Sequence, residues 1–274
     1  MIYELKKERF GSIKDIVHKQ WDNIEIMAVL SGINTGWVFV DSLETPATAL
    51  LWSKGIEGFY FIGNPDNHTF NAEIIEFIIN HLRFRIIQSG LNHFEFSGDC
   101  IMWDSVLEKI FNFKELIKSR QCVYQLDFDK WKYHKTNGLC KDTDIRKIDL
   151  NLIQSAEILN PEFIESEILR WWDSLDYFFE QAFGFCVIEN KKIVSYCITN
   201  FVYQNTYTIG IETLEHHRRR GFSQMATESF VSKLLEDGCE PYWDCMFTNT
   251  ASRSLAEKLG FYLDHTYSLY TLPL

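Results

Sequence analysis

Residues Thr206 to Ser223 read TYTIGIETLEHHRRRGFS, and this stretch decides how the second half of the chain is interpreted. Its first eight residues are typical of a β-strand, and apolar residues recur at helical spacing from Ser223 to Glu236. Gly221 stands between the two patterns. A strand, a glycine-containing turn and a helix in this order present backbone N–H groups and the positive end of the helix dipole to an anion. The stretch therefore predicts a phosphate-binding loop.

The composition of this loop suits a diphosphate. Gly221 removes the side chain where a phosphate must approach closely, and Ser223 is small and can cap the helix. Arginine and histidine side chains add positive charge to a chain whose formal net charge is −11. They are His216, His217, Arg218, Arg219 and Arg220. A solvated basic loop is the alternative interpretation, but the flanking strand and helix favour a phosphate site. Because the histidines have no other ligands at usable spacing, no metal site is predicted.

A second motif lies downstream in the segment NTASRSLAEKLGF, which begins at Asn249. It follows Gly221 by 28 residues, a spacing that accommodates one helix and one strand. The pattern Arg218-x-x-Gly221-x-Ser223 resembles the coenzyme A motif of the GNAT acetyltransferase superfamily, in which Gly or Ala usually stands at the serine position. The downstream segment resembles the second motif of that superfamily. The resemblance covers roughly residues 140–274 by motif.

This resemblance implies an acetyl-CoA site in the second half of the chain and no metal. Backbone groups of Ile211 and Thr213 would pair with the pantetheine arm as an added strand does. Asn249 and Ser252 would flank the pantetheine near its thioester. The pyrophosphate would be held by the loop residues Arg218, Arg219, Arg220, Gly221, Phe222 and Ser223.

The resemblance also implies direct transfer, in which an amine attacks the thioester after a base has removed its proton. An amine with a pKa of about 10 is almost fully protonated at neutral pH, so a carboxylate that accepts the proton is valuable. Glu212, on the predicted strand before the loop, is one candidate for this base, and Asp244, on the neighbouring strand, is the other. For each, a solvated or salt-bridged strand residue is the alternative interpretation.

The general acid is left unassigned. Many members of the superfamily place a tyrosine seven residues after the motif asparagine, and that position is Ala256 in this chain. The coenzyme A thiolate, with a pKa near that of cysteine (~8.5), can leave without strong acid help. Cys245 was considered as a nucleophile, but a cysteine in an aromatic-rich strand is more typical of a small buried apolar residue.

The two halves of the chain follow one predicted order of elements. In the second half, strands are predicted at 144–148, 183–188, 193–203, 206–213, 242–247 and near 267–272, and helices at 150–159, 160–172, 223–236 and 250–259. In the first half, strands are predicted at 36–40, 47–52, 58–62, 92–96 and 121–128, and helices at 71–88 and 102–111. Coincidence is the alternative, because strand–helix alternation is common.

We interpret the repeated order as a tandem duplication of one GNAT-like α+β unit, in which helices flank a mixed, mostly antiparallel sheet. Residues 1–130 would form a degenerate GNAT-like domain and residues 131–274 the acetyltransferase domain, with a boundary near 131–141. The first half has Asn64-Pro-Asp-Asn-His-Thr69 in place of the loop. Its acid and its proline, which removes one N–H donor, argue against a coenzyme there.

Composition narrows the class of protein. The N-terminus lacks the apolar core of a signal peptide, and no apolar run approaches the ~20 residues of a membrane helix. Seven cysteines without CxxC spacing indicate reduced thiols, so a cytoplasmic location is expected. The acidic net charge disfavours binding to nucleic acid.

The leading hypothesis is an acetyl-CoA-dependent N-acetyltransferase acting on a small-molecule amine or an aminoacyl group. Tandem-GNAT aminoacyl transfer from charged tRNA is a second hypothesis, disfavoured by the pyrophosphate motif and the acidic charge. A non-catalytic acyl-CoA-binding regulatory protein is a third, kept open by Ala256. No nucleic acid or membrane partner is expected, a homodimer is compatible with the sequence, and the acceptor is not specified by it.

Overall fold

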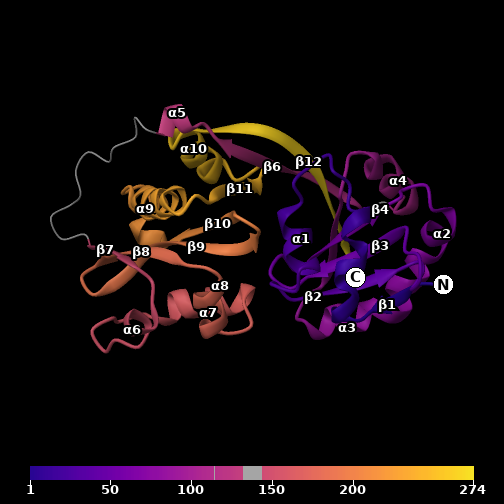
Figure 1. Cartoon of the computed structure of the whole chain (residues 1–274), viewed down its shortest axis with the longest axis horizontal. Coiled ribbons are helices and arrows are strands. Elements are labelled where there is room, and N and C mark those ends of the chain that lie inside the picture. The colour runs from indigo at the N-terminus through magenta and orange to yellow at the C-terminus, as the bar shows by residue number, and fades with distance from the viewer. Residues whose placement is uncertain (114, 132–143) are drawn as a thin grey trace. The chain divides into compact units, whose positions relative to one another are not determined.

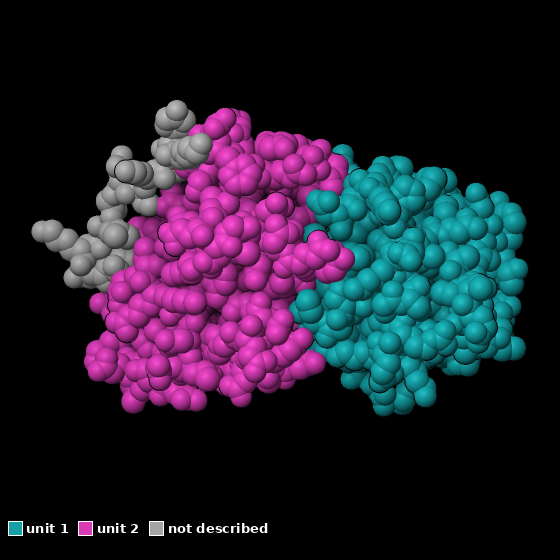
Figure 2. All heavy atoms as spheres, viewed as in Figure 1, with its two compact units in different colours: residues 1–121, 266–274 teal, residues 122–265 magenta. Residues whose placement is uncertain are grey.

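The computed structural model describes residues 1–113, 115–131 and 144–274, and these form two compact units (Figures 1 and 2). Unit 1 comprises residues 1–121 and 266–274, and unit 2 comprises residues 122–265. Of the predicted boundary segment 131–141, all but the first residue lies outside the described residues. None of the helices within the described ranges is both long and apolar enough to cross a membrane.

Unit 1 is built on a sheet with the strand order β1-β2-β3-β4-β5. Its strands are antiparallel except for the parallel pair β4–β5, which the helical segment α2-η2-α3 connects as a crossover. The elements are β1 (Tyr3–Leu5), the 3-10 helix η1 (Lys7–Ile16), α1 (Ile24–Leu30), β2 (Gly36–Val40), β3 (Thr48–Ser53), β4 (Gly58–Gly63), α2 (His68–Phe77), the π-helix η2 (Ile78–Leu82), α3 (Arg83–Gln88), β5 (His93–Gly98) and α4 (Met102–Ile110).

Unit 2 repeats this plan with the strand order β7-β8-β9-β10-β11. Again the strands are antiparallel except for the last pair, β10–β11, which is parallel and connected by a helix. The elements are α5 (Phe128–Trp131), β7 (Asp144–Lys147), α6 (Leu150–Ile153), α7 (Glu162–Trp171), α8 (Leu175–Gln181), β8 (Gly184–Glu189), β9 (Lys192–Tyr203), β10 (Thr206–Thr213), the 3-10 helix η3 (Glu215–His217), α9 (Phe222–Glu236), β11 (Glu240–Met246) and α10 (Thr250–Lys258). The predicted α+β class and the repeated order of elements in the two halves are confirmed.

Helices cover both faces of each sheet. In unit 1, alternate residues of β3 enter different cores: Leu50 packs with α2, α3 and α4, whereas Leu51 packs with η1 and α1. In unit 2, α9 packs on β8, β9 and β10, and α7 packs on the opposite face of β9 (Figure 1). The core under α9 includes Phe222, Phe230 and Trp243. Each unit therefore has the three-layer arrangement that its strand pattern requires.

One predicted helix, at residues 150–159, is wrong in length. The helix α6 begins after Asp149, whose carboxylate accepts the Leu152 N–H at 2.7 Å, and ends at Ile153. Beyond it, Asn160 exchanges two side-chain hydrogen bonds, of 2.8 and 2.9 Å, with the backbone of Ile193 on β9. At the end of the predicted helix, the Leu159 N–H donates to the Lys191 carbonyl at 2.9 Å, so a bond to the turn before β9 replaces the helical one that local propensity favoured. The elements before residue 35, α5, α8 and η3 were not predicted, and the last strand, predicted near 267–272, spans Phe261–Pro273.

Two long strands contribute residues to both units. The strand β6 (Ile117–Leu126) begins in unit 1 and ends in unit 2, and β12 (Phe261–Pro273) begins in unit 2 and ends in unit 1. Residues 270–273 of β12 pair antiparallel with residues 93–96 of β5. Unit 1 is therefore completed by the last strand of the second half of the chain.

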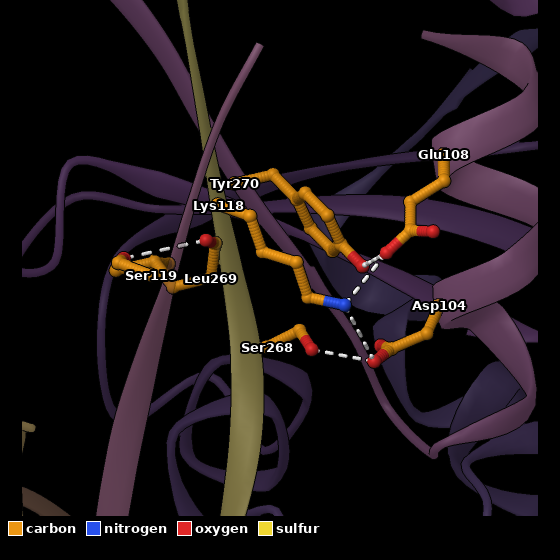
Figure 3. A network of polar contacts seen from close by, with 7 residues as sticks. All are labelled: Asp104, Glu108, Lys118, Ser119, Ser268, Leu269 and Tyr270. Atoms are coloured by element: carbon orange, nitrogen blue, oxygen red, sulfur yellow. Dashed lines mark hydrogen bonds and ion pairs between the residues drawn. The ribbon is translucent and has the colours of Figure 1, made fainter. Parts of the chain in front are cut away.

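A polar network holds this strand in unit 1 (Figure 3). Lys118 on β6 places its Nζ 2.6 Å from Oε1 of Glu108 and 3.5 Å from Oδ2 of Asp104, both on α4. On β12, the Tyr270 hydroxyl donates to Glu108 at 3.0 Å, and the Ser268 hydroxyl donates to Asp104 at 2.5 Å. The hydrogen bond from Lys118 holds the pKa of the Glu108 carboxyl below its ordinary value. The network joins three elements that are far apart in the sequence.

We predict that Tyr270→Phe lowers the free energy of unfolding by about 1 kcal/mol, because it removes the part-buried hydrogen bond that joins the fully buried Tyr270 of β12 to Glu108 of α4. The matched control is Tyr262→Phe on the same strand, where the hydroxyl bonds Gln125 at an exposed site and the residue is 43% exposed. Urea unfolding of both variants measures the difference. Equal destabilisation by the two substitutions would contradict the role given to the network.

Candidate functional site

The candidate site begins where β10 leaves its parallel neighbour. Pairing between β10 and β11 joins residues 206–208 to residues 240–242, and no further pair between their described residues is recorded, although both strands continue. The pairing of β10 with β9 shifts register between Tyr207 and Ile209, and Thr208 Oγ1 accepts the Phe201 N–H at 2.8 Å. Such a bulge bends and twists a strand. This irregularity accounts for the opening between β10 and β11.

The open edge of β10 carries the peptide groups of Ile211 and Thr213. Leu214 donates its N–H to Val194 of β9 at 2.9 Å, so alternation turns the peptide groups of the odd-numbered residues toward the other edge. The Thr213 N–H donates to Oε1 of Glu212 at 3.1 Å, and its carbonyl accepts from Nε of Arg218 at 3.2 Å. The two predicted pantetheine-pairing residues therefore point to the same edge, and Thr213 has internal partners there.

The loop after η3 forms a concave run of backbone N–H groups. Arg219 and Gly221 have positive φ angles of 62° and 85°, whereas Arg220 between them does not. Alternation of this kind makes an anion-binding nest. The expected capping of α9 by Ser223 is wrong: Gly221 is the N-cap, and no side chain caps that helix. A β-carbon at Gly221 would meet no atom within 4 Å. Among the described residues, no protein acceptor is recorded for the N–H groups of Gly221, Phe222 and Ser223.

Two of the three loop arginines are committed to carboxylates of the protein. Arg220 makes a bidentate pair with Glu189 at the end of β8, at 2.5 and 2.8 Å, and its hydrogen bonds lower the pKa of that carboxyl. Arg218 lies 3.0 Å from Glu212. Arg219 is exposed and has no ion-pair partner among the described residues. The guanidinium available to an anion is thus that of Arg219.

The second motif positions the helix α10. Asn249 caps it by accepting the Ser252 N–H at 3.1 Å, and the Ser252 hydroxyl accepts from the indole of Trp243 at 3.0 Å. Both predicted pantetheine-flanking residues therefore hold the start of α10 against β11. Ala256, where the superfamily often has tyrosine, is fully buried in the core under α9 and α10.

The two candidate bases lie on the same face of the sheet. Glu212 stands directly opposite Tyr196 of β9, whose ring contacts Phe163 of α7. Asp244 follows Tyr242, which is in register with Thr208, so strand alternation also places it on the α7 face. The carboxylates differ in their environment, because Glu212 is 45% exposed and ion-paired. By contrast, desolvation raises the pKa of the half-buried Asp244 carboxyl to about 6.

Two other chemical roles considered for this region receive no support. Burial raises the pKa of the Cys245 thiol to about 11, so it is protonated at neutral pH and unsuited to nucleophilic attack. Within the part of the chain that the structure describes, no group of three or more His, Cys, Asp or Glu side chains is placed to hold a metal ion.

Two residues that shape the site were not predicted from the sequence. Glu189 anchors Arg220, and the buried Ser195 bonds both the Glu212 carbonyl, at 2.9 Å, and the Thr213 hydroxyl, at 2.7 Å. Both precede the loop by more than 20 residues and belong to no local motif. Only strand pairing brings them to the loop.

In the corresponding region of unit 1, protein side chains accept backbone N–H groups. Asn67, the N-cap of α2, accepts the Phe70 N–H at 3.1 Å, so a side chain occupies this helix start. At the end of the parallel pair β4–β5, the buried Asp99 carboxylate accepts the N–H groups of Gly63, at 3.1 Å, and His18, at 2.8 Å. The N-terminus of α2 thus differs from that of α9, which has no such cap.

Comparison with known proteins gives the following likenesses. A family model described as GNAT acetyltransferase matches residues 14–270. The "Uncharacterized N-acetyltransferase YdfB" of Bacillus subtilis is 28% identical over 275 residues, which is 98% of this chain and 98% of that protein.

Two solved structures share the fold over nearly the whole chain. A GCN5-related N-acetyltransferase-like protein from Streptococcus suis has a TM-score of 0.66 at 19% identity and covers 97% of this chain and 100% of its own. A tandem GNAT protein from the clavulanic acid biosynthesis pathway also has a TM-score of 0.66, at 10% identity, and covers 100% of this chain and 98% of its own.

We predict that Asp244→Asn raises the melting temperature at pH 7.5 and not at pH 4. The carboxyl has a pKa of about 6 in the folded protein, above its ordinary value of 3.8, so its ionisation costs stability as the pH rises through this interval. The amide carries no charge at either pH. Scanning calorimetry at the two pH values measures the difference. A variant that is less stable than the wild type at pH 7.5 would contradict the desolvation of Asp244.

Proposed function

The chain belongs to the GNAT acetyltransferase family, and we propose that it transfers an acetyl group from acetyl-CoA to an amine of a small molecule or of an aminoacyl group. The coenzyme would bind in unit 2. The observation that carries this proposal is the uncapped start of α9, with its left-handed Gly221 and its N–H groups without recorded acceptors.

The residues of the loop fit the pyrophosphate of coenzyme A. The N–H groups of Gly221, Phe222 and Ser223 supply hydrogen-bond donors at the positive end of the helix dipole. The Arg219 guanidinium supplies a mobile cation, while Arg220 and Arg218, held by Glu189 and Glu212, fix the ends of the loop. The bound coenzyme supplies an activated thioester, and the protein supplies its orientation.

The open edge of β10 fits the pantetheine arm. Peptide groups of Ile211 and Thr213 face that edge, so an extended amide-containing chain can add to the sheet there. The Glu212 carboxylate and Arg218 engage Thr213 in the structure, so they must release its peptide groups when the arm pairs with them. Asn249 and Ser252 contribute by fixing the start of α10 beside β11.

Asp244 is the better-suited of the two candidate bases. An ammonium group must lose its proton before attack, and a base with a pKa near the working pH is the most effective acceptor. Desolvation brings the pKa of Asp244 to about 6, whereas Glu212 is committed to Arg218 and to the Thr213 N–H. We assign proton removal to Asp244, and loop closure together with attraction of the ammonium ion to Glu212.

The protein supplies no tyrosine acid from position 256. The side chain there is a buried alanine, and the nearby Tyr124 hydroxyl already bonds Arg253 at 3.2 Å and Glu257 at 3.3 Å. Burial raises the pKa of Tyr124. The thiolate of coenzyme A, with a pKa of roughly 8.5, can depart without such an acid. In this proposal residues 131–274 carry the reaction, and residues 1–130 bind no coenzyme, because Asn67 and Asp99 occupy the corresponding positions.

We predict that Arg219→Glu weakens acetyl-CoA binding at least tenfold, because it places a negative charge beside the pyrophosphate. Isothermal titration calorimetry measures the affinity. The matched control is Lys258→Glu, the same change of charge at the exposed last residue of α10, which should leave the affinity unchanged.

No heat from the wild type at millimolar coenzyme would exclude the proposed function. Binding without thiol release for any amine would favour a non-catalytic regulatory protein.

We predict that kcat/KM of the wild type falls as the pH drops through about 6, because the base must be ionised to accept a proton. In Asp244→Asn the activity should fall by roughly a hundredfold and this acidic limb should disappear. The control, Glu212→Gln, should keep the limb and change mainly KM. Thiol-release assays from pH 5 to 9 check both variants. If the acidic limb persists in Asp244→Asn and disappears in Glu212→Gln, then Glu212 and not Asp244 is the base, and the assignment is wrong.

A further inference from the structure

Unit 1 contains a cavity of about 520 Å³ that belongs to no part of the transferase site. Its lining includes the deeply buried Ile78, Phe94 and Phe111, with the more exposed Ile79 and Phe113. Most of the remaining lining is also apolar. This size and composition lie within the range of pockets that bind small molecules.

The cavity is not a remnant of a coenzyme site. The end of unit 1 that corresponds to the phosphate loop lies at the C-terminal ends of β4 and β5, where Asp99 bonds Gly63. Phe94 lies near the opposite end of β5 and precedes Asp99 by five residues, roughly 16 Å along an extended strand. The cavity therefore lies away from the position that a coenzyme would occupy in this fold.

A π-helical turn shapes one wall of the cavity. The helical segment from His68 to Gln88 is interrupted by η2 (Ile78–Leu82), and residues 78 and 79 both line the cavity. Ile78 is 6% exposed and Ile79 is 56% exposed, so one side chain reaches the core and the next stands at the surface. π-Helical segments are rare in proteins. Those that do occur often lie at functional sites, where the extra residue redirects the side chains.

The charged lining residues define the class of ligand. Arg83 and Glu115 are exposed, and neither has an ion-pair partner among the described residues. A ligand with one charge would gain from one of them and be repelled by the other, whereas a ligand with both charges can pair with both. We infer that the cavity binds a small zwitterion with an apolar side chain, of the class of the apolar α-amino acids. The carboxylate pairs with Arg83, the ammonium group pairs with Glu115, and the side chain enters the apolar lining.

Such a ligand would also touch the strand that completes unit 1. Leu272 of β12 lines the cavity and is paired in register with Phe94 of β5. A molecule packed against both strands is bound by the folded unit and not by the unfolded chain, so it stabilises the attachment of β12. Binding should therefore raise the melting temperature of the full chain.

The test uses L-phenylalanine as the probe and the full-length protein. Saturable binding by calorimetry is expected, together with a rise in melting temperature. Phenylacetate and phenethylamine, which each keep one of the two charges, should bind at least tenfold more weakly. No binding of phenylalanine, leucine or tryptophan at millimolar concentration would overturn the inference, and so would equal binding of phenylacetate.

Variants locate the bound molecule. Arg83→Gln and Glu115→Gln should each weaken phenylalanine binding at least tenfold, while acetyl-CoA binding stays unchanged. The matched control is Lys109→Gln, at an exposed residue of α4 outside the cavity lining, which should bind phenylalanine as the wild type does. Circular dichroism verifies the fold of each variant. Phenylalanine could also bind in unit 2 as an acceptor, in which case affinity would survive Arg83→Gln and fall in Asp244→Asn, and the inference would be wrong.

Discussion

The first backbone N–H groups of an α-helix have no acceptor within the helix, and the protein leaves those of α9 without a side-chain cap. A capping oxygen here would occupy the N–H groups that we propose for the pyrophosphate. Gly221 begins the helix with a φ of 85°, which a residue without a β-carbon adopts at little cost, and supplies no side-chain acceptor. Glu189 holds Arg220, and Glu212 holds Arg218, so the loop keeps its shape while its donors face outward.

The same constraint explains why two units of one plan differ in chemistry. Unit 1 has the parallel strand pair and the crossover helix, but Asn67 caps that helix and Asp99 bridges the ends of the strands. These two side chains accept the N–H groups of Phe70, Gly63 and His18. Unit 2 leaves the equivalent donors open and lets β10 diverge from β11 after Thr208. Duplication of a fold therefore preserves the scaffold, while a few polar side chains decide whether a site exists.

The strands β6 and β12 each contribute residues to both units, so neither half of the chain contains all the strands of its own unit. Unit 1 acquires its strand beside β5 only when residues 270–273 arrive from the far end of the sequence. Lys118 pairs with the carboxylates of Asp104 and Glu108. The same carboxylates accept hydrogen bonds from Ser268 and Tyr270 and so hold β12 in place (Figure 3). The first 130 residues alone would lack this strand and leave that hydrogen-bonding edge of β5 unpaired by it.

The sequence by itself determined the α+β class, the tandem plan, the strand and helix on either side of the loop, and the place of Gly221 in the turn between them. These depend on local periodicity and on residues close together in the chain. Tertiary structure alone decided that Glu189 and Glu212 occupy two of the three arginines, that desolvation raises the pKa of Asp244, and that β12 completes unit 1. Ion pairing, burial and strand exchange depend on residues far apart in sequence, and no local sequence pattern predicts which of these residues come into contact.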